Sequence, residues 1–90
     1  MAKRTVPIRH PRIVHRFAAR LRELRLARGM TQAYLAGRAS VTPNYLGRLE
    51  GAGAAPGIDL VERLAVALGT TMADLLPTAD TPDPHAVLAQ

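Results

Sequence analysis

This chain contains two short stretches, MTQAYLA at residues 30–36 and LGRLE at residues 46–50, that predict neighbouring helices. Thr31 and Thr42 each stand just before one of these helices. A threonine hydroxyl at that position accepts a hydrogen bond from one of the first free N–H groups of a helix. The two stretches therefore carry their own start signals.

The predicted helices span about residues 32–39 and 43–50, with a tight turn at Ser40-Val41 between them. Pro43 occupies the first position of the second helix, where the missing N–H of proline costs nothing. Small and apolar residues are spaced so that the two helices can pack together. These inward-facing residues are Leu35, Ala36, Ala39, Leu46 and Leu49.

Three further helices are predicted around this pair. A first helix over about residues 12–28 has an apolar stripe, which Ile13 is expected to extend back by one turn, and Gly29 ends it. Another helix is predicted over 58–68. A short last helix, capped by Thr71, is predicted to run through Leu76, before Pro77. The stripe of the first helix consists of Phe17, Leu21 and Leu24.

The two ends of the chain lack such periodicity. Residues 1–11 are basic and contain two prolines, which predicts a flexible basic arm. Residues 77–90 contain three prolines among small polar residues, which predicts a disordered tail. The expected organisation is an all-α domain over residues 12–76 between an arm and a tail.

Composition excludes several classes of function. The 90 residues suffice for one domain, and the absence of cysteine excludes disulfides, thiolate metal sites and cysteine nucleophiles. His10, His15 and His85 lack the spacing and the acidic partners of a metal site. No catalytic arrangement, phosphate-binding loop, signal peptide or membrane span is visible. We therefore expect a cytoplasmic protein that is not an enzyme and needs no cofactor or metal.

Charge is distributed unevenly along the chain. The net charge is +5, yet residues 1–28 hold nine of the twelve Lys and Arg residues and only one acid, Glu23. One interpretation is a polyanionic partner, such as nucleic acid, that is contacted through the N-terminal third. The other is a solvated helix face beside a basic tail. Charge alone leaves both interpretations open.

Taken together, the motifs resemble the phage-repressor and Cro-like (XRE) helix-turn-helix family. The resemblance covers residues 17–76 in order and spacing. It implies a five-helix, lambda-repressor-like fold whose third helix enters the major groove of double-stranded DNA. The matching segments are Leu21 to Arg25, Gly29 to Gln32, Leu35-Ala36, Leu46 to Glu50, Pro56, Leu64 to Gly69 and Asp74 to Leu76.

The resemblance also implies roles for individual residues. Gln32 falls where family members contact a phosphate. Arg25 and Glu50 fall where many members form a buried ion pair. The positions that contact bases or the DNA backbone in the family correspond to Thr42, Pro43, Asn44 and Arg48. Their neighbour Tyr45 is a further candidate for a DNA contact.

Each of these roles has a simpler alternative. Asn44 and Arg48 lie one turn apart on the face opposite the leucines and suit adenine and guanine, respectively, but both can be ordinary surface residues. Tyr45 can contact DNA or cover the junction of the two helices. Gln32 can be an ordinary polar residue at a helix start. Arg25 and Glu50 can be solvated side chains.

Three departures from the family pattern stand out. Ser40 replaces the usual turn glycine, so a positive φ there is expected to cost about 1 kcal/mol. The loop at 51–57 carries no basic residue, and Gly57 replaces the usual serine cap. The arm is expected to supply the missing contacts by reaching along the DNA backbone or into the minor groove. The candidates for backbone contacts are Lys3, Arg4 and Arg9 in the arm and Arg12 at the start of the first helix.

The expected function is sequence-specific DNA binding by a small transcriptional regulator of the repressor type. We expect a homodimer whose two half-sites lie about 34 Å apart. Met72, Leu75 and Leu76 are candidates for the dimer contact, or else they complete the core. Two alternatives are a DNA-binding antitoxin whose tail folds on a toxin, and a protein-interaction module that has lost DNA affinity.

Overall fold

The computed structural model describes residues 11–76, which form five helices without any strand. The all-α prediction is confirmed. The predicted arm and tail lie outside the described residues, apart from Pro11, which directly precedes the first helix. The helices are α1 (Arg12–Ala27), α2 (Gln32–Ala39), α3 (Pro43–Glu50), α4 (Ile58–Leu68) and α5 (Met72–Leu75).

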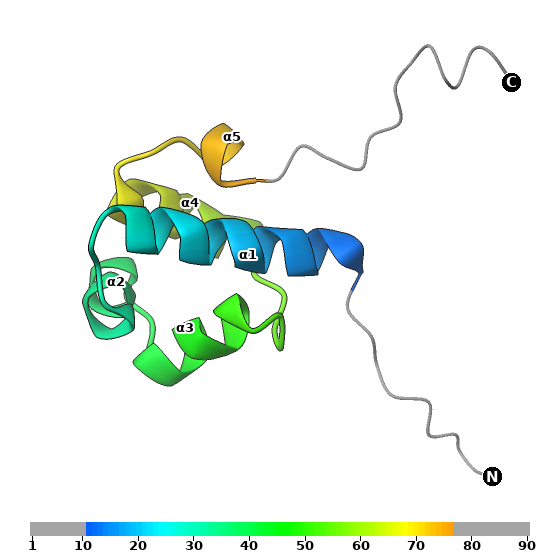
Figure 1. Ribbon diagram of the computed structural model, residues 1–90, viewed down its shortest axis with the longest axis horizontal. Helices are drawn as coiled ribbons and strands as arrows, with labels where there is room; N and C mark the ends of the chain where they lie inside the picture. The colour runs from blue at the N-terminus through cyan, green and yellow to red at the C-terminus, as the bar shows by residue number, and fades with distance from the viewer. Residues whose placement is uncertain (1–10, 77–90) are drawn as a thin grey trace, which may run out of the picture.

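The helices pack around α1 and α4. In Figure 1, α1 crosses the middle of the domain, with α3 on one side of it and α5 on the other. α2 packs against both α3 and α4, while α1 contacts α3 and α5. The outer face of α3 is therefore turned away from α5. None of the described helices has both the length and the apolar character required to span a membrane.

A leucine-rich core fills the space between the helices. Leu46 and Leu49 on α3 are completely buried, as predicted, and so are Leu35 and Ala39 on α2. The remaining buried apolar residues come from α1, α2, α4, α5 and the loop before α4. They include Phe17, Ala18, Leu21, Leu24, Ala36, Ala54, Leu60, Val61, Leu64, Ala65, Ala67, Leu68 and Leu75.

The prediction that Ile13 extends the core stripe is wrong. Ile13 is 52% exposed, and its neighbour Val14 is buried instead. Val14 precedes Leu21 by seven residues, which is close to two full helical turns and keeps both side chains on one face. Ile13 is displaced from that face by a further 100° of helix rotation.

Threonine hydroxyls begin three of the helices. Thr31, Thr42 and Thr71 each accept a hydrogen bond of 3.0 Å from the backbone N–H three residues later, as predicted. The last helix differs in detail, because the carboxylate of Asp74 accepts from Thr70 Oγ1. α5 also ends at Leu75, one residue before the predicted end.

Four helices end in the same hydrogen-bond pattern, in which a residue with left-handed backbone terminates the helix. Gly29 and Gly69 serve in this way after α1 and α4. Ser40, with φ of 61°, serves after α2, so the turn position does require the positive φ that its usual glycine would adopt freely. Ala52, also with φ of 61°, ends α3, although glycines flank it. The flanking Gly53 N–H then donates to the Arg48 carbonyl over 2.7 Å.

Candidate nucleic-acid interface

The outer face of α3 presents the residues proposed to contact DNA. Thr42 and Pro43 start the helix, and Leu46 and Leu49 anchor its inner face in the core. Thr42, Pro43, Asn44 and Arg48 are consequently exposed on the opposite side. Since Asn44 and Arg48 are four residues apart, their side chains leave the same face of α3. The geometry thus offers an amide and a guanidinium side by side to a ligand.

Arg48 is held by two contacts within the protein. Its guanidinium carbon lies 5.9 Å from the centre of the Tyr45 ring. Its Nη2 donates a hydrogen bond of 3.1 Å to the backbone carbonyl of Gly53 in the loop after α3. Tyr45 is itself half-buried and packs against the core. Neither contact of Arg48 was predicted from the sequence.

Gln32 has a partner on the neighbouring helix. Its Nε2 donates to Glu50 Oε1 over 3.1 Å, which links the start of α2 to the end of α3. The same side chain passes over Gly47, where an added Cβ would lie 3.7 Å from Gln32 Oε1. The side chain is therefore tethered at the α2–α3 junction, while the residue as a whole stays exposed.

Arg25 of α1 and Glu50 of α3 form a bidentate ion pair. Arg25 Nε lies 2.6 Å from Glu50 Oε2, and Arg25 Nη2 lies 2.9 Å from Glu50 Oε1. The side chains are only 9% and 4% exposed, respectively. The hydrogen bond to Glu50 raises the pKa of Arg25, although burial opposes this effect. Both charges are shielded from water, so separating them would leave each one buried without a partner. The pair therefore holds α3 against α1.

Arg25 also stabilises the connection between α1 and α2. Its Nη1 donates to the Met30 carbonyl over 2.8 Å, and its own carbonyl accepts from the Met30 N–H over 3.1 Å. One arginine therefore joins α1, the following loop and α3. Arg25 lies on the inner side of α3, so it supports this helix and is not itself exposed for a contact with DNA.

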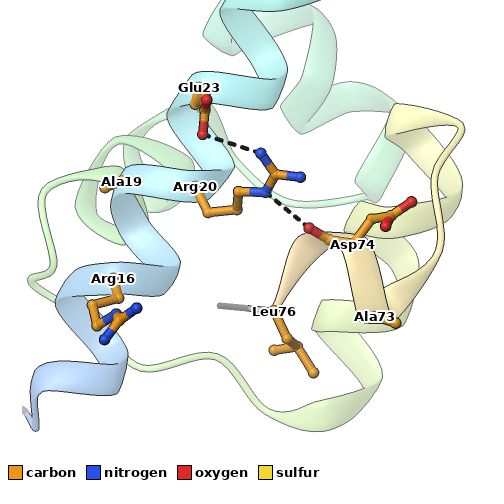
Figure 2. Close-up of a pocket in the computed structure, with 7 residues that line it drawn as sticks. All are labelled: Arg16, Ala19, Arg20, Glu23, Ala73, Asp74 and Leu76. Carbon is orange, nitrogen blue, oxygen red and sulfur yellow. Dashed lines mark hydrogen bonds and ion pairs between the residues drawn. The ribbon is translucent and has the colours of Figure 1, made fainter. Parts of the chain in front are cut away.

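Other arginines of the basic N-terminal third are engaged in helix packing. Arg28 donates to the carbonyl of Leu68 at the end of α4. Arg20 donates to the carbonyl of Asp74 over 2.8 Å and to Glu23 over 3.1 Å, as Figure 2 shows. Since α5 and α3 lie on opposite sides of α1, Arg20 contributes to the far side of the domain. Part of the positive charge of the N-terminal third therefore stabilises helix packing, which was not predicted from the sequence.

Four residues near the N-terminus are the candidates for contacts with the DNA backbone. Lys3, Arg4 and Arg9 lie outside the described residues, and Arg12 is the first, exposed residue of α1. His15 on α1 is also exposed. Within residues 11–76, no three His, Asp or Glu side chains are grouped so that they could hold a metal ion.

A shallow apolar groove lies beside the α3–α4 loop. Ile58 at the start of α4 is 70% exposed, and Leu76 after α5 is 37% exposed. Together with Ile13 they border a floor of buried side chains. The groove is lined by Ile13, Val14, Phe17, Ala55, Pro56, Ile58, Val61 and Leu76.

The three candidates for dimer contacts fall into different environments. Leu75 is completely buried and completes the core. Met72 is half-buried and packs against that core. Only Leu76 reaches the apolar groove. Leu75 is accordingly a core residue, and the groove includes apolar residues of α1 and α4 that were not predicted as a surface.

Comparison with known proteins supports the helix-turn-helix fold described above. A family model described as a helix-turn-helix domain matches residues 16–78. The chain is 32% identical to the restriction-modification controller protein C.AhdI from Aeromonas hydrophila, with a TM-score of 0.69. That match covers 70% of this chain and 96% of the controller protein. No match was found among curated proteins.

Two further solved structures show how far the similarity extends. The clp gene regulator ClgR from Corynebacterium glutamicum is 32% identical, with a TM-score of 0.70, over 72% of this chain and 69% of that protein. Hydroxypropylphosphonic acid epoxidase from S. wedmorenis is 29% identical, with a TM-score of 0.69, over 74% of this chain. Only 36% of the epoxidase is covered, so the likeness concerns one part of that enzyme.

Proposed function

We propose that this chain, which belongs to the helix-turn-helix domain family and is a DNA-binding regulator, recognises one specific duplex DNA sequence through α3. The observation that carries the proposal is that Asn44 and Arg48 are exposed on the outer face of α3, while the inner face of this helix is buried in the core. An eight-residue helix of this kind fits the major groove.

The two side chains suit different bases. A guanidinium bonds O6 and N7 of guanine together, and a carboxamide bonds N6 and N7 of adenine. Arg48 is therefore proposed to select guanine and Asn44 to select adenine. Thr42, Pro43 and Tyr45 at the start of α3 are proposed to lie against the bases or the adjacent backbone.

Gln32 is proposed to lie near a phosphate at the start of α2. Its hydrogen bond to Glu50 uses one N–H of the carboxamide, and the helix N-terminus adds favourable charge for an anion. In this role the tether to Glu50 orients Gln32 before DNA arrives. Lys3, Arg4 and Arg9 of the arm and Arg12 of α1 remain proposed contacts to the DNA backbone.

The proposed regulator acts as a homodimer, with the apolar groove as the contact between the two copies. The groove is bordered by apolar side chains that are exposed to water in a single copy, namely Ile13, Ile58 and Leu76. A second copy would bury them. A two-fold dimer presents two copies of α3 to a two-fold symmetric DNA site. It also doubles the small number of base contacts that one α3 helix supplies.

Selection of bound sequences from a random duplex pool, at about physiological salt, tests this proposal. A specific dimeric regulator enriches a motif with two-fold symmetry, with a guanine and an adenine in each half-site. A folded protein that enriches no motif would contradict it. That outcome would favour the protein-interaction role, and enrichment only with a co-purified partner would favour the antitoxin role.

A further inference from the structure

The loop after α3 holds no basic residue, yet it contacts the side chain of a proposed base-reading residue. The Gly53 carbonyl accepts from Arg48 Nη2 over 3.1 Å. The Gly53 N–H donates to the Arg48 backbone carbonyl over 2.7 Å, so the two residues are joined twice. The left-handed backbone of Ala52 turns the chain so that both bonds form. The path of the loop thus restricts where the guanidinium can lie.

Tyr45 restricts the same guanidinium from a second direction. The Arg48 guanidinium carbon lies 5.9 Å from the centre of the Tyr45 ring, within the range of a cation–π contact. Tyr45 cannot easily move, because it is half-buried and packs against the core. An arginine side chain otherwise samples many rotamers, and ordering it on binding costs free energy. A carbonyl and an aromatic face together lower that cost before DNA arrives.

The held guanidinium keeps donors available. A guanidinium has five N–H groups, and Gly53 accepts from only one of them. Bidentate recognition of guanine needs two. The contacts with Gly53 and Tyr45 are therefore compatible with base recognition by the remaining donors.

We infer that Tyr45 and the Gly53 carbonyl are positioning groups that fix the Arg48 guanidinium for selective recognition of a base. This inference rests on the proposed function and names a specificity role for Tyr45 that does not require Tyr45 to touch DNA. It also gives the uncharged loop a part in recognition. The competing explanation is that Tyr45 affects base discrimination only through its own contact with DNA, independently of Arg48.

A double-mutant cycle separates the two explanations. The variants are Tyr45→Leu, Arg48→Ala and both together, and each is measured on the selected site and on a site with the Arg48-dependent base replaced. Tyr45→Leu is expected to reduce discrimination at that base about two- to fivefold, the worth of an exposed cation–π contact. In the Arg48→Ala background, Tyr45→Leu should change discrimination no further. An equal loss in both backgrounds would overturn the inference.

The matched control is Tyr45→Phe, which keeps the aromatic face and removes only the hydroxyl. It is expected to preserve base discrimination. A loss as large as that of Tyr45→Leu would show that the hydroxyl acts instead, and would contradict the inference. Thermal unfolding of each variant identifies any loss that arises from misfolding.

A measurement without DNA keeps this test independent of the proposed function. NMR relaxation of the Arg48 Nε–H bond in the free protein reports how tightly the guanidinium is held. The order parameter should fall in Tyr45→Leu and persist in Tyr45→Phe. Equal order in all three proteins would overturn the positioning role. Failure of every protein to select a DNA sequence would instead contradict the proposed function.

Discussion

Arg48 is the residue on which base recognition is proposed to depend most. Replacing it by alanine removes the guanidinium and leaves α3 capped by Thr42 and anchored by Leu46 and Leu49. We expect Arg48→Ala to weaken binding to the selected site by about 1–3 kcal/mol and to relax preference at one base position. Competition binding against all single-base variants of the site checks this.

The matched control is Arg22→Ala, an exposed arginine on α1 outside the proposed contact. It removes the same charge and should leave the order of preference among sites unchanged. If Arg48→Ala weakened binding to all sequences equally, Arg48 would be a phosphate contact and not a base contact.

The Arg25–Glu50 pair predicts a large effect on stability. Replacing Glu50 by glutamine removes the negative charge and leaves the Arg25 guanidinium buried without a counter-ion. Breaking such a pair costs about 3–5 kcal/mol in the free energy of unfolding. Denaturant unfolding measures this cost. The value is expected at the lower end of that range, because the side-chain amide of the new glutamine can still accept a hydrogen bond from Arg25.

Glu23→Gln provides the comparison, since it breaks the exposed pair with Arg20. That pair is a surface contact, which is worth about 0–1 kcal/mol. Similar losses for Glu50→Gln and Glu23→Gln would show that the buried pair is not a principal link between α1 and α3.

At the scale of helices, much of the fold was predictable because the deciding signals are local. Threonine caps and periodic leucines lie within a few residues of the structure that they specify, and α2, α3 and α4 have the predicted bounds. Contacts between distant helices were harder to predict. The bonds from Arg28 to the end of α4 and from Arg63 to the end of α2 join residues far apart in sequence. The positive φ of Ala52 was missed because alanine rarely adopts it.

At two helix ends a non-glycine residue has a left-handed backbone conformation, and we predict that glycine at either position stabilises the protein. Ser40 and Ala52 both adopt φ of 61°, where a Cβ crowds the backbone. Ser40→Gly and Ala52→Gly should each raise the free energy of unfolding by up to about 1 kcal/mol, although the greater freedom of glycine in the unfolded chain offsets part of the gain. Thermal unfolding measures the change.

Two controls accompany this prediction. Ser40→Ala keeps the Cβ and should give no comparable gain. Gly29→Ala introduces a Cβ at φ of 66° and should destabilise the domain, even though no atom lies within 4 Å of that Cβ. Destabilisation by both glycine substitutions would contradict the assignment of strain to these helix ends.

At the scale of the whole molecule, the apolar groove is proposed to join two copies. Ile58→Glu places a charge at the border of that groove, and because Ile58 is exposed in one copy the variant should keep its fold. The variant should sediment as a monomer at concentrations where the unmodified protein is a dimer. Its affinity for a two-fold site should fall, because the two α3 helices no longer act together.

Val66→Glu is the control, since Val66 lies on the same helix, is 72% exposed and does not line the groove. It should leave the oligomeric state unchanged. A dimer that resists Ile58→Glu would place the contact between copies elsewhere, and a monomeric unmodified protein would contradict the proposed dimer.

The most direct test of the central claim is methylation interference on the selected site. Methylation of guanine at N7 blocks the acceptor that Arg48 is proposed to use in the major groove. The account predicts that methylation of one guanine in each half-site prevents binding of the unmodified protein. Arg48→Ala should bind more weakly but lose this interference. Interference that persists unchanged in Arg48→Ala, or that is absent from both proteins, would contradict base recognition by α3.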